Sequence, residues 1–112
     1  LHHMLGYVKS KGTAIEFMAE KDRITMAKIM EDLFENKLTT LMGQALAIDD
    51  EFRELNMFRA SMEKGHQFII RPSGTELKVK IYAFAKGSSE EEADKEAEKM
   101  VEELLAFGDT YK

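Results

Sequence analysis

Hydrophobic residues near the end of the chain recur every three or four positions, and charged residues fill the positions between them. This spacing predicts an amphipathic helix from about Ser89 to Phe107. Ser89 followed three residues later by Glu92 is typical of a capping box at a helix start. Gly108 is expected to end the helix in a left-handed conformation. The predicted buried face consists of Ala93, Ala97, Met100, Val101, Leu104 and Leu105.

A second helical pattern lies nearer the start of the chain. It predicts a helix from about Asp22 to Asn36, with Asp22 as its N-cap residue. Methionine is a flexible side chain that fills gaps in cores, so a core role is favoured over a binding surface. The predicted buried face is Met26, Ile29, Met30, Leu33 and Phe34.

Apolar and polar residues alternate with a period of two in much of the remaining chain, which predicts strands. Glu63–Gly65 is short enough to join two antiparallel strands as a hairpin. Segment 13–19 is the first predicted strand. It also permits an early extension of the helix that follows it, because it contains alanine, glutamate and methionine. The predicted strands are 13–19, 41–48, 56–62, 66–71 and 78–86, and 49–51 is expected to be an acidic connection.

These elements predict an α+β fold, in which a mainly antiparallel sheet of four to five strands carries two helices on one face. No internal repeat occurs, and the single proline leaves no obvious linker between domains. Leu1–Met4 resembles the remnant of a purification tag before a start methionine, so its histidine pair is left out of functional reasoning. Residues 5–112 are therefore expected to form a single domain.

The composition fits one ordinary globular domain of 112 residues, of which 44% are hydrophobic and 33% are charged. A domain of this size has room for one core and for a shallow or shared site. The absence of cysteine excludes a disulfide framework and a thiolate metal site, and it is compatible with a reducing cytoplasm. No segment approaches the roughly 20 apolar residues that cross a bilayer. A soluble, cytoplasmic protein is expected.

The net charge of −5 argues against nucleic-acid binding, which requires a basic surface. The charges are unevenly distributed, however. Between His66 and Lys86 four basic residues accompany one acidic residue, a balance that suits a small anion. Between Gly87 and Phe107 eight acidic residues accompany two lysines, as expected for the solvated face of a helix.

The segment Arg71–Glu76 is the strongest candidate for chemistry, because it lies between two predicted strands and contains the single proline. An arginine fork binds phosphate in a bidentate manner, hydroxyl groups donate protons, and a glycine lets backbone N–H groups approach a ligand. The same residue types also suit a surface turn that has no ligand. A Walker-type phosphate loop is excluded by the glycine spacing. The candidate ligands are Arg71, Ser73, Gly74, Thr75 and, on the non-core face of the next strand, Lys80.

The stretch from Arg71 to Tyr82, RPSGTELKVKIY, is similar to the phosphate-binding loop and following strand in the C-terminal domain of the α-D-phosphohexomutases. This family contains the phosphoglucomutases and phosphomannomutases. A looser similarity extends over about Gly12 to Phe107. Leu77 stands where the family most often has proline, a difference that removes no phosphate donor. The resemblance implies the last of four domains, with a fold of the TATA-binding-protein type.

The resemblance also implies a function. In the family, a phosphoserine of the first domain donates its phosphoryl group to a hexose phosphate. The resulting bisphosphate reorients and returns its other phosphoryl group to the serine, with Mg²⁺ assisting and a hexose bisphosphate as activator. The C-terminal domain grips the phosphate that is not transferred. By resemblance, this phosphate clamp consists of Arg71, Ser73, Gly74, Thr75 and Lys80.

Catalysis is not expected from this chain alone, because the family's phosphoserine, metal-binding and sugar-reading loops have no counterpart in the sequence. A magnesium role for Asp49 and Asp50 is disfavoured in a surface turn, and His66 is expected to be structural or exposed. No catalytic or metal-binding residue is predicted. The expected partners are a hexose phosphate and the other three domains of the parent enzyme, without nucleic acid or membrane. A complete protein that binds phosphate-bearing ligands without catalysis is the alternative.

Overall fold

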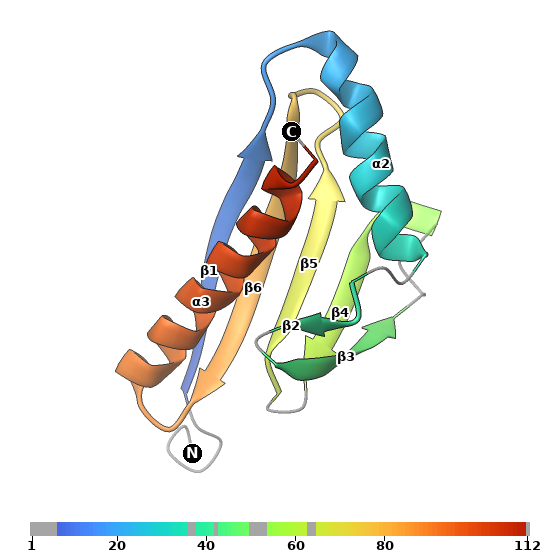
Figure 1. Cartoon of the computed structure of the whole chain (residues 1–112). Helices are drawn as coiled ribbons and strands as arrows, with labels where there is room; N and C mark the ends of the chain where they lie inside the picture. The colour runs from blue at the N-terminus through green and yellow to red at the C-terminus, as the bar shows by residue number, and fades with distance from the viewer. Residues whose placement is uncertain (1–6, 36–37, 42, 50–53, 63–64, 112) are drawn as a thin grey trace.

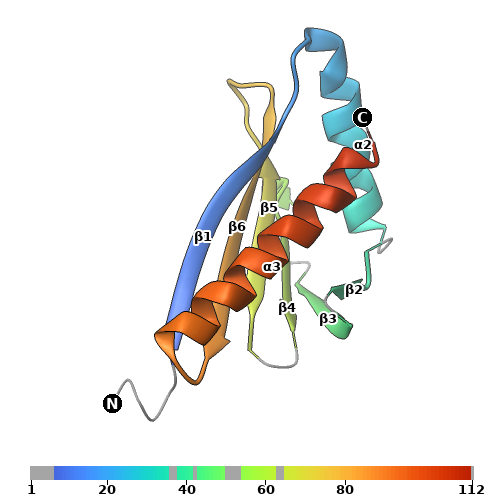
Figure 2. The ribbon, with the colours of Figure 1, turned by 60° about the vertical axis from the view of Figure 1, so that its left-hand side comes forward.

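Both helices pack on one face of a single antiparallel sheet (Figures 1 and 2). The computed structural model describes residues 7–35, 38–41, 43–49, 54–62 and 65–111. The sheet has six strands in the spatial order β1-β6-β5-β4-β3-β2. The α+β prediction is therefore confirmed, with more strands than expected. The strands are β1 (Tyr7–Glu16), β2 (Thr40–Leu41), β3 (Gln44–Asp49), β4 (Phe58–Met62), β5 (Gln67–Pro72) and β6 (Lys78–Gly87).

The two helices divide the covered face of the sheet between them. A short 3-10 turn, η1 (Glu20–Asp22), leads into α2 (Arg23–Phe34), which packs on β4 and β5. The C-terminal helix α3 (Glu90–Asp109) packs on β1 and β6. In the described part of the chain, the opposite face of the sheet has no covering layer, and it is called the open face below (Figure 2).

The core lies between the helices and the covered face of the sheet. Alternate residues of β4, β5 and β6 are buried, as the period of two predicts. The predicted helix faces are confirmed, although Phe34, Val101 and Leu105 are only partly buried. The fully buried larger side chains are Phe58, Phe68, Ile29, Leu33, Ile70, Ile81, Met100, Leu104 and Val79, together with His66.

The two ends of α3 are held in different ways. The Ser89 hydroxyl accepts the N–H of Glu92 at 3.1 Å, so the predicted N-cap is confirmed. The Glu92 carboxylate accepts from the N–H and hydroxyl of Ser88. The prediction for Gly108 is wrong, because this residue lies inside the helix. A Cβ there would lie 2.1 Å from Cδ1 of Ile15, so close packing against β1 explains the glycine.

Asp22 occupies the N-cap position of α2, as predicted, but its side chain forms no capping hydrogen bond with the helix. Its carboxylate accepts the N–H of Ala19 at 3.2 Å and so supports the preceding 3-10 turn. The helix ends at Phe34. Asn36, where the helix was predicted to end, lies outside the described residues.

Segment 41–48 is not one strand, as predicted, but belongs to two short strands. Gly43 has a φ of +75° and lies between β2 and β3, which pair as an antiparallel hairpin. Asp49 belongs to β3 and pairs with Arg59 of β4 at 3.8 Å, so it is not part of a surface turn. Residues 50 and 51 of the predicted acidic connection are not among the described residues.

The predicted hairpin between β4 and β5 is confirmed, with shifted boundaries. The two strands pair antiparallel, and Gly65 before β5 has a φ of +90°. Asn56 has a φ of +56°, which strand backbone does not adopt, so β4 begins at Phe58 rather than at Asn56. Residues 63 and 64 lie outside the description.

The first strand begins six residues earlier than predicted and ends at Glu16. Its early half was missed because Lys9 and Lys11 lie where a strand usually has apolar residues. They instead form ion pairs with α3, Lys9 with Glu90 at 2.6 Å and Lys11 with Asp94 at 3.5 Å. The predicted tag remnant and start methionine precede the described residues.

His66 has a structural position, with 1% of its surface exposed. Its Nδ1 accepts the N–H of Lys86 at 2.9 Å, and its Nε2 lies 3.7 Å from the Glu96 carboxylate. The ring therefore links the start of β5, the end of β6 and α3. This geometry supports the structural alternative of the prediction and excludes an exposed ring.

The C-terminal end of the chain is tied to α2 by a polar contact. The Tyr111 hydroxyl donates a hydrogen bond to the buried carboxylate of Asp32, which also pairs with Lys28 at 3.3 Å. Burial, and then this hydrogen bond, raise the pKa of Tyr111 from 10.0 to about 12.

This pKa shift predicts a loss of stability at alkaline pH. The folded state retains the Tyr111 proton more tightly than the unfolded chain, so the free energy of unfolding should fall between pH 10.0 and about 12. Tyr111→Phe should show a smaller fall over that range. It should also be less stable by about 1 kcal/mol at neutral pH, the usual contribution of one hydrogen bond. Urea unfolding at several pH values tests this, and equal pH dependence in both proteins would contradict it.

Candidate phosphate-binding site

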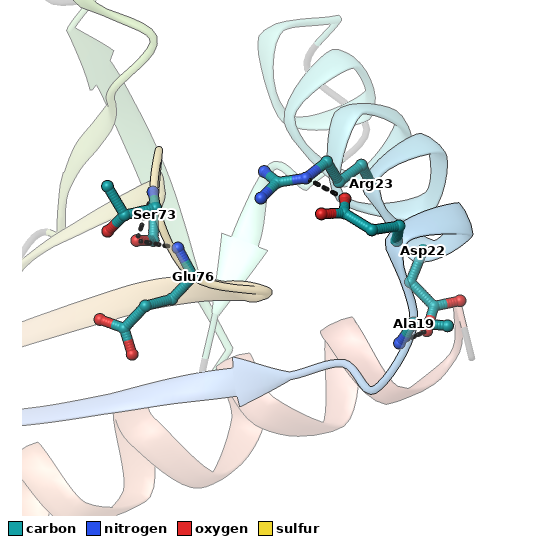
Figure 3. A network of polar contacts seen from close by, with 7 residues as sticks. Ala19, Asp22, Arg23, Ser73 and Glu76 are labelled. Carbon is teal, nitrogen blue, oxygen red and sulfur yellow. Dashed lines mark hydrogen bonds and ion pairs between the residues drawn. The ribbon is translucent and has the colours of Figure 1, made fainter.

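The predicted site lies at the end of the sheet where β5 turns into β6, beside the start of α2 (Figures 1 and 3). The two strands are antiparallel neighbours near the centre of the sheet. Arg71 and Pro72 end β5, and Lys78 begins β6. The intervening loop, residues 73–77, is therefore held at both ends by paired strands.

Ser73 determines the shape of this loop. Its N–H donates to the carbonyl of Lys78 at 2.9 Å. Its hydroxyl oxygen accepts the N–H of Glu76 at 3.1 Å and that of Thr75 at 3.4 Å (Figure 3). The hydroxyl proton remains able to donate to a ligand. Ser73 can therefore both hold the turn and contact an anion.

Gly74 and Thr75 form the exposed tip of the loop. Gly74 does not have a positive φ, so the backbone conformation does not require glycine there. A Cβ at Gly74 would have no heavy atom within 4 Å. The glycine therefore leaves the loop backbone accessible, which is the role that the sequence predicts for it.

Arg71 and Lys80 are brought together by strand pairing. They lie directly opposite each other on β5 and β6, and both belong to the open face. Neither forms an ion pair within the described residues, whereas neighbouring Lys78 pairs with Glu76 at 2.9 Å. Like charges directly opposite each other destabilise a sheet. An anion bound between Arg71 and Lys80 would remove this repulsion.

The pairing of Lys78 with Glu76 changes the pKa of both groups. The hydrogen bond with Glu76, and then its charge, raise the pKa of Lys78, and the same contacts lower the pKa of Glu76. Lys78 is therefore already compensated within the loop region. Arg71 and Lys80 are the better candidates for binding an anion.

The charged residues are separated between the two faces of the domain. The acidic residues of α3 lie on the helical side, where some of them pair with Lys9 and Lys11. The strand positions of the open face carry mostly basic residues, with Glu16 and Asp49 as the acidic ones. The basic residues there are Arg59, Arg71, Lys78, Lys80 and Lys86.

The sequence prediction missed Arg23, the first residue of α2. Its side chain extends from the helix on the side of the Ser73 loop, and its Nε donates to the Glu20 carboxylate at 2.6 Å (Figure 3). A cation is disfavoured at a helix N-terminus by the helix dipole. An arginine at this position is therefore unusual, and this sequence feature could have marked Arg23 as a candidate residue beside the loop.

Two hollows lie near this end of the sheet, and three of the five predicted residues line one or the other. The larger, of about 750 Å³, lies between α2 and the loop and includes Ser73 and Gly74. The smaller, of about 450 Å³, includes Lys80. Arg71 is the cross-strand partner of Lys80. Arg71 and Thr75 line neither hollow, so the five predicted residues do not line one enclosed cavity.

The larger hollow combines an apolar wall with charges of both signs. Arg23 lies at the start of α2, and Glu31 and Glu35 lie near its end. The acidic residues make that end unfavourable for a phosphate. The apolar wall consists of Met26, Ala27, Met30 and Phe34.

Within the described ranges, no group of three or more histidine, aspartate and glutamate residues is placed to hold a metal ion. Neither α2 nor α3 is long and apolar enough to cross a membrane.

Comparison with models of known protein families found no match for this chain, and a search of curated proteins found no matching relative. The local geometry of the loop and the resemblance of its sequence are therefore the grounds for assigning a function.

Proposed function

We propose that this chain is a sugar-phosphate-binding domain that holds the non-transferred phosphate of a hexose phosphate. In this proposal it is the C-terminal domain of a cytoplasmic phosphohexomutase. The clamp residues are Arg71, Ser73, Gly74, Thr75 and Lys80.

The pairing of Arg71 with Lys80 is the observation that carries the proposal. Two cations opposite each other on neighbouring strands, neither in an ion pair with another described residue, are costly for the sheet. Binding sites commonly retain such features at the expense of stability. A dianionic phosphate is the chemical group that such a pair fits best.

The contribution of the domain to catalysis is orientation. Arg71 provides a planar fork that fixes two phosphate oxygens, and Lys80 adds a point charge. The adjoining turn supplies the hydroxyl groups of Ser73 and Thr75 as further donors. A sugar held by one phosphate presents its other end to the reacting groups, which reduces the entropic cost of the transfer.

The other three domains of the parent enzyme would supply the chemical step. Their phosphoserine would give its phosphoryl group to a hydroxyl of the hexose phosphate and later recover the other one. Mg²⁺ and a hexose bisphosphate activator belong to that part of the proposal. The isolated chain is therefore expected to bind the ligand without converting it.

Arg71→Ala should weaken the binding of glucose 6-phosphate by about tenfold to a hundredfold, the effect of losing a charged hydrogen-bond pair worth about 1.5–3 kcal/mol. The affinity of Arg71→Lys for glucose 6-phosphate should lie between those of Arg71→Ala and the unmodified chain, because lysine keeps the charge but loses the fork. NMR titration of the chain measures these affinities. The backbone resonances of the loop report directly on the site.

Lys86→Ala provides the matched control, since Lys86 is an exposed cation on the same strand and the same face as Lys80. It should bind the ligand with nearly unchanged affinity. Arg71→Ala should also be at least as stable as the unmodified chain, because it relieves the repulsion with Lys80. Equal affinity of the Arg71 and Lys86 variants, or no binding by the unmodified chain, would refute the proposed site.

A further inference from the structure

We infer that the smaller hollow, on the open face between β1 and β6, is the subsite for the sugar ring of the bound hexose phosphate. This inference rests on the proposed function and deepens it, since it adds a second contact region to the phosphate clamp. The hollow has a volume of about 450 Å³. It is lined by Gly12, Thr13, Ala14, Glu16, Lys78, Lys80 and Tyr82.

The hollow exists because β1 has small residues where β6 has large ones. Gly12 lies opposite Tyr82, and Ala14 lies opposite Lys80. A Cβ at Gly12 would lie 3.7 Å from Cδ1 of Tyr82, so the tyrosine ring leans over the glycine. The small residues form a floor, and the ring forms a wall that is 36% exposed. The apolar face of a sugar ring fits against such an aromatic wall.

The charges around the hollow favour one orientation of a bound sugar phosphate. Lys78 is compensated by Glu76 at 2.9 Å, and the more distant charge of Glu16 also raises the pKa of Lys78. Among the described residues Lys80 forms no ion pair, and the charge of Glu76 acts on it only at longer range. The phosphate should therefore lie toward Lys80, and the Glu16 carboxylate can accept hydrogen bonds from ring hydroxyls.

The strand order makes the hollow and the clamp continuous. Arg71 on β5, Lys80 on β6 and Ala14 on β1 form one row across the sheet. Neighbouring strands lie about 4.8 Å apart, so this row spans roughly 10 Å. A six-membered ring that carries a phosphate ester extends over a similar length. One ligand can therefore contact Arg71 and the hollow together.

The larger hollow is the less suitable place for the ring. It is open to Glu31 and Glu35, and Arg23 beside it is already paired with Glu20. Neither Arg71 nor Lys80, the two cations of the clamp, lines it. A ring bound there would leave the row formed by Arg71, Lys80 and Ala14 unused.

Gly12→Val provides the sharpest test, because it fills the hollow without disturbing the clamp. Valine is favoured in strands, and an added Cβ has ordinary contact distances, so the variant should fold normally. Glucose 6-phosphate and inorganic phosphate are titrated into the chain and followed by NMR. Ser10→Val, on the same strand and face but outside the hollow, is the matched control.

The unmodified chain should bind glucose 6-phosphate about tenfold more tightly than inorganic phosphate, which corresponds to about 1.4 kcal/mol. Gly12→Val and Tyr82→Ala should each remove most of this preference and leave the affinity for inorganic phosphate unchanged. Ser10→Val should keep the preference. The resonances of Gly12 and Tyr82 should respond to the sugar phosphate but not to inorganic phosphate.

Two results would overturn the inference and leave the proposed function standing. In the first, both ligands bind in an Arg71-dependent manner with equal affinity. In the second, the preference survives in Gly12→Val, or the sugar phosphate shifts resonances of α2 instead of β1. A chain that binds neither ligand would overturn the proposed function, and the inference with it.

Discussion

Phe68→Ala is expected to lower the free energy of unfolding by about 3–5 kcal/mol, the usual cost of removing a buried aromatic side chain. Phe68 lies on the covered face of β5 and is fully buried. Its ring centroid is 6.0 Å from that of Phe58, which is 6.4 Å from that of Phe34. These three rings connect β5 through β4 to α2. The substitution should therefore loosen α2 as well as leave a cavity.

Urea unfolding measures this loss, and two comparisons identify its cause. Phe68→Leu keeps most of the volume and should cost less than half as much. Ile69→Ala changes the neighbouring residue on the open face and should cost about 1 kcal/mol, because that side chain is only partly buried. Equal losses for Phe68→Ala and Ile69→Ala would contradict a core on one face of the sheet.

Gly87→Ala is expected to destabilise the chain by about 3 kcal/mol, near the upper end of overpacking costs. Gly87 ends β6 and lies against the first turns of α3. A Cβ there would lie 2.5 Å from the backbone nitrogen of Ala93 and 3.0 Å from its Cα. Because these are backbone atoms, no side-chain rotation relieves the clash. The helix would have to move away from the sheet.

Gly74→Ala is the matched control for Gly87→Ala. Gly74 has no positive φ and open space around an added Cβ, so its substitution should change stability by less than about 0.5 kcal/mol. The two unfolding midpoints should therefore differ clearly. Similar midpoints would mean that the connection from β6 to α3 can adjust more easily than the contacts at Gly87 imply.

The elements with strong periodicity could be predicted from the sequence, since their patterns depend only on local burial. The helix over Glu90–Asp109 and the strand over Lys78–Gly87 are examples. The start of β1 could not be predicted, because Lys9 and Lys11 are explained by acidic residues of α3, about 80 positions away along the chain. Gly108 was misinterpreted for a similar reason, since the contact with Ile15 that requires glycine exists only in the folded chain.

The candidate site was partly predictable. Residue types alone pointed to Arg71 and Lys80, but their direct opposition depends on the register of β5 and β6. Ser73 can both hold the turn and contact an anion only because of the path of the loop, which one sequence does not reveal. The hollow beside Tyr82 could not be seen either, because Gly12 lies 70 positions away and is placed there only by the pairing of β1 with β6.

The separation of charge between the two faces determines how an anion would approach the domain. The acidic residues of α3 lie about one layer away from the open face, roughly 10 Å. Salt at physiological concentration screens exposed charges over about 8 Å. Repulsion from the helix should therefore fade before it reaches Arg71 and Lys80, whose attraction acts at close range. A molecule with a net charge of −5 can still steer a phosphate toward this end of the sheet, because the local field and the total charge differ in sign.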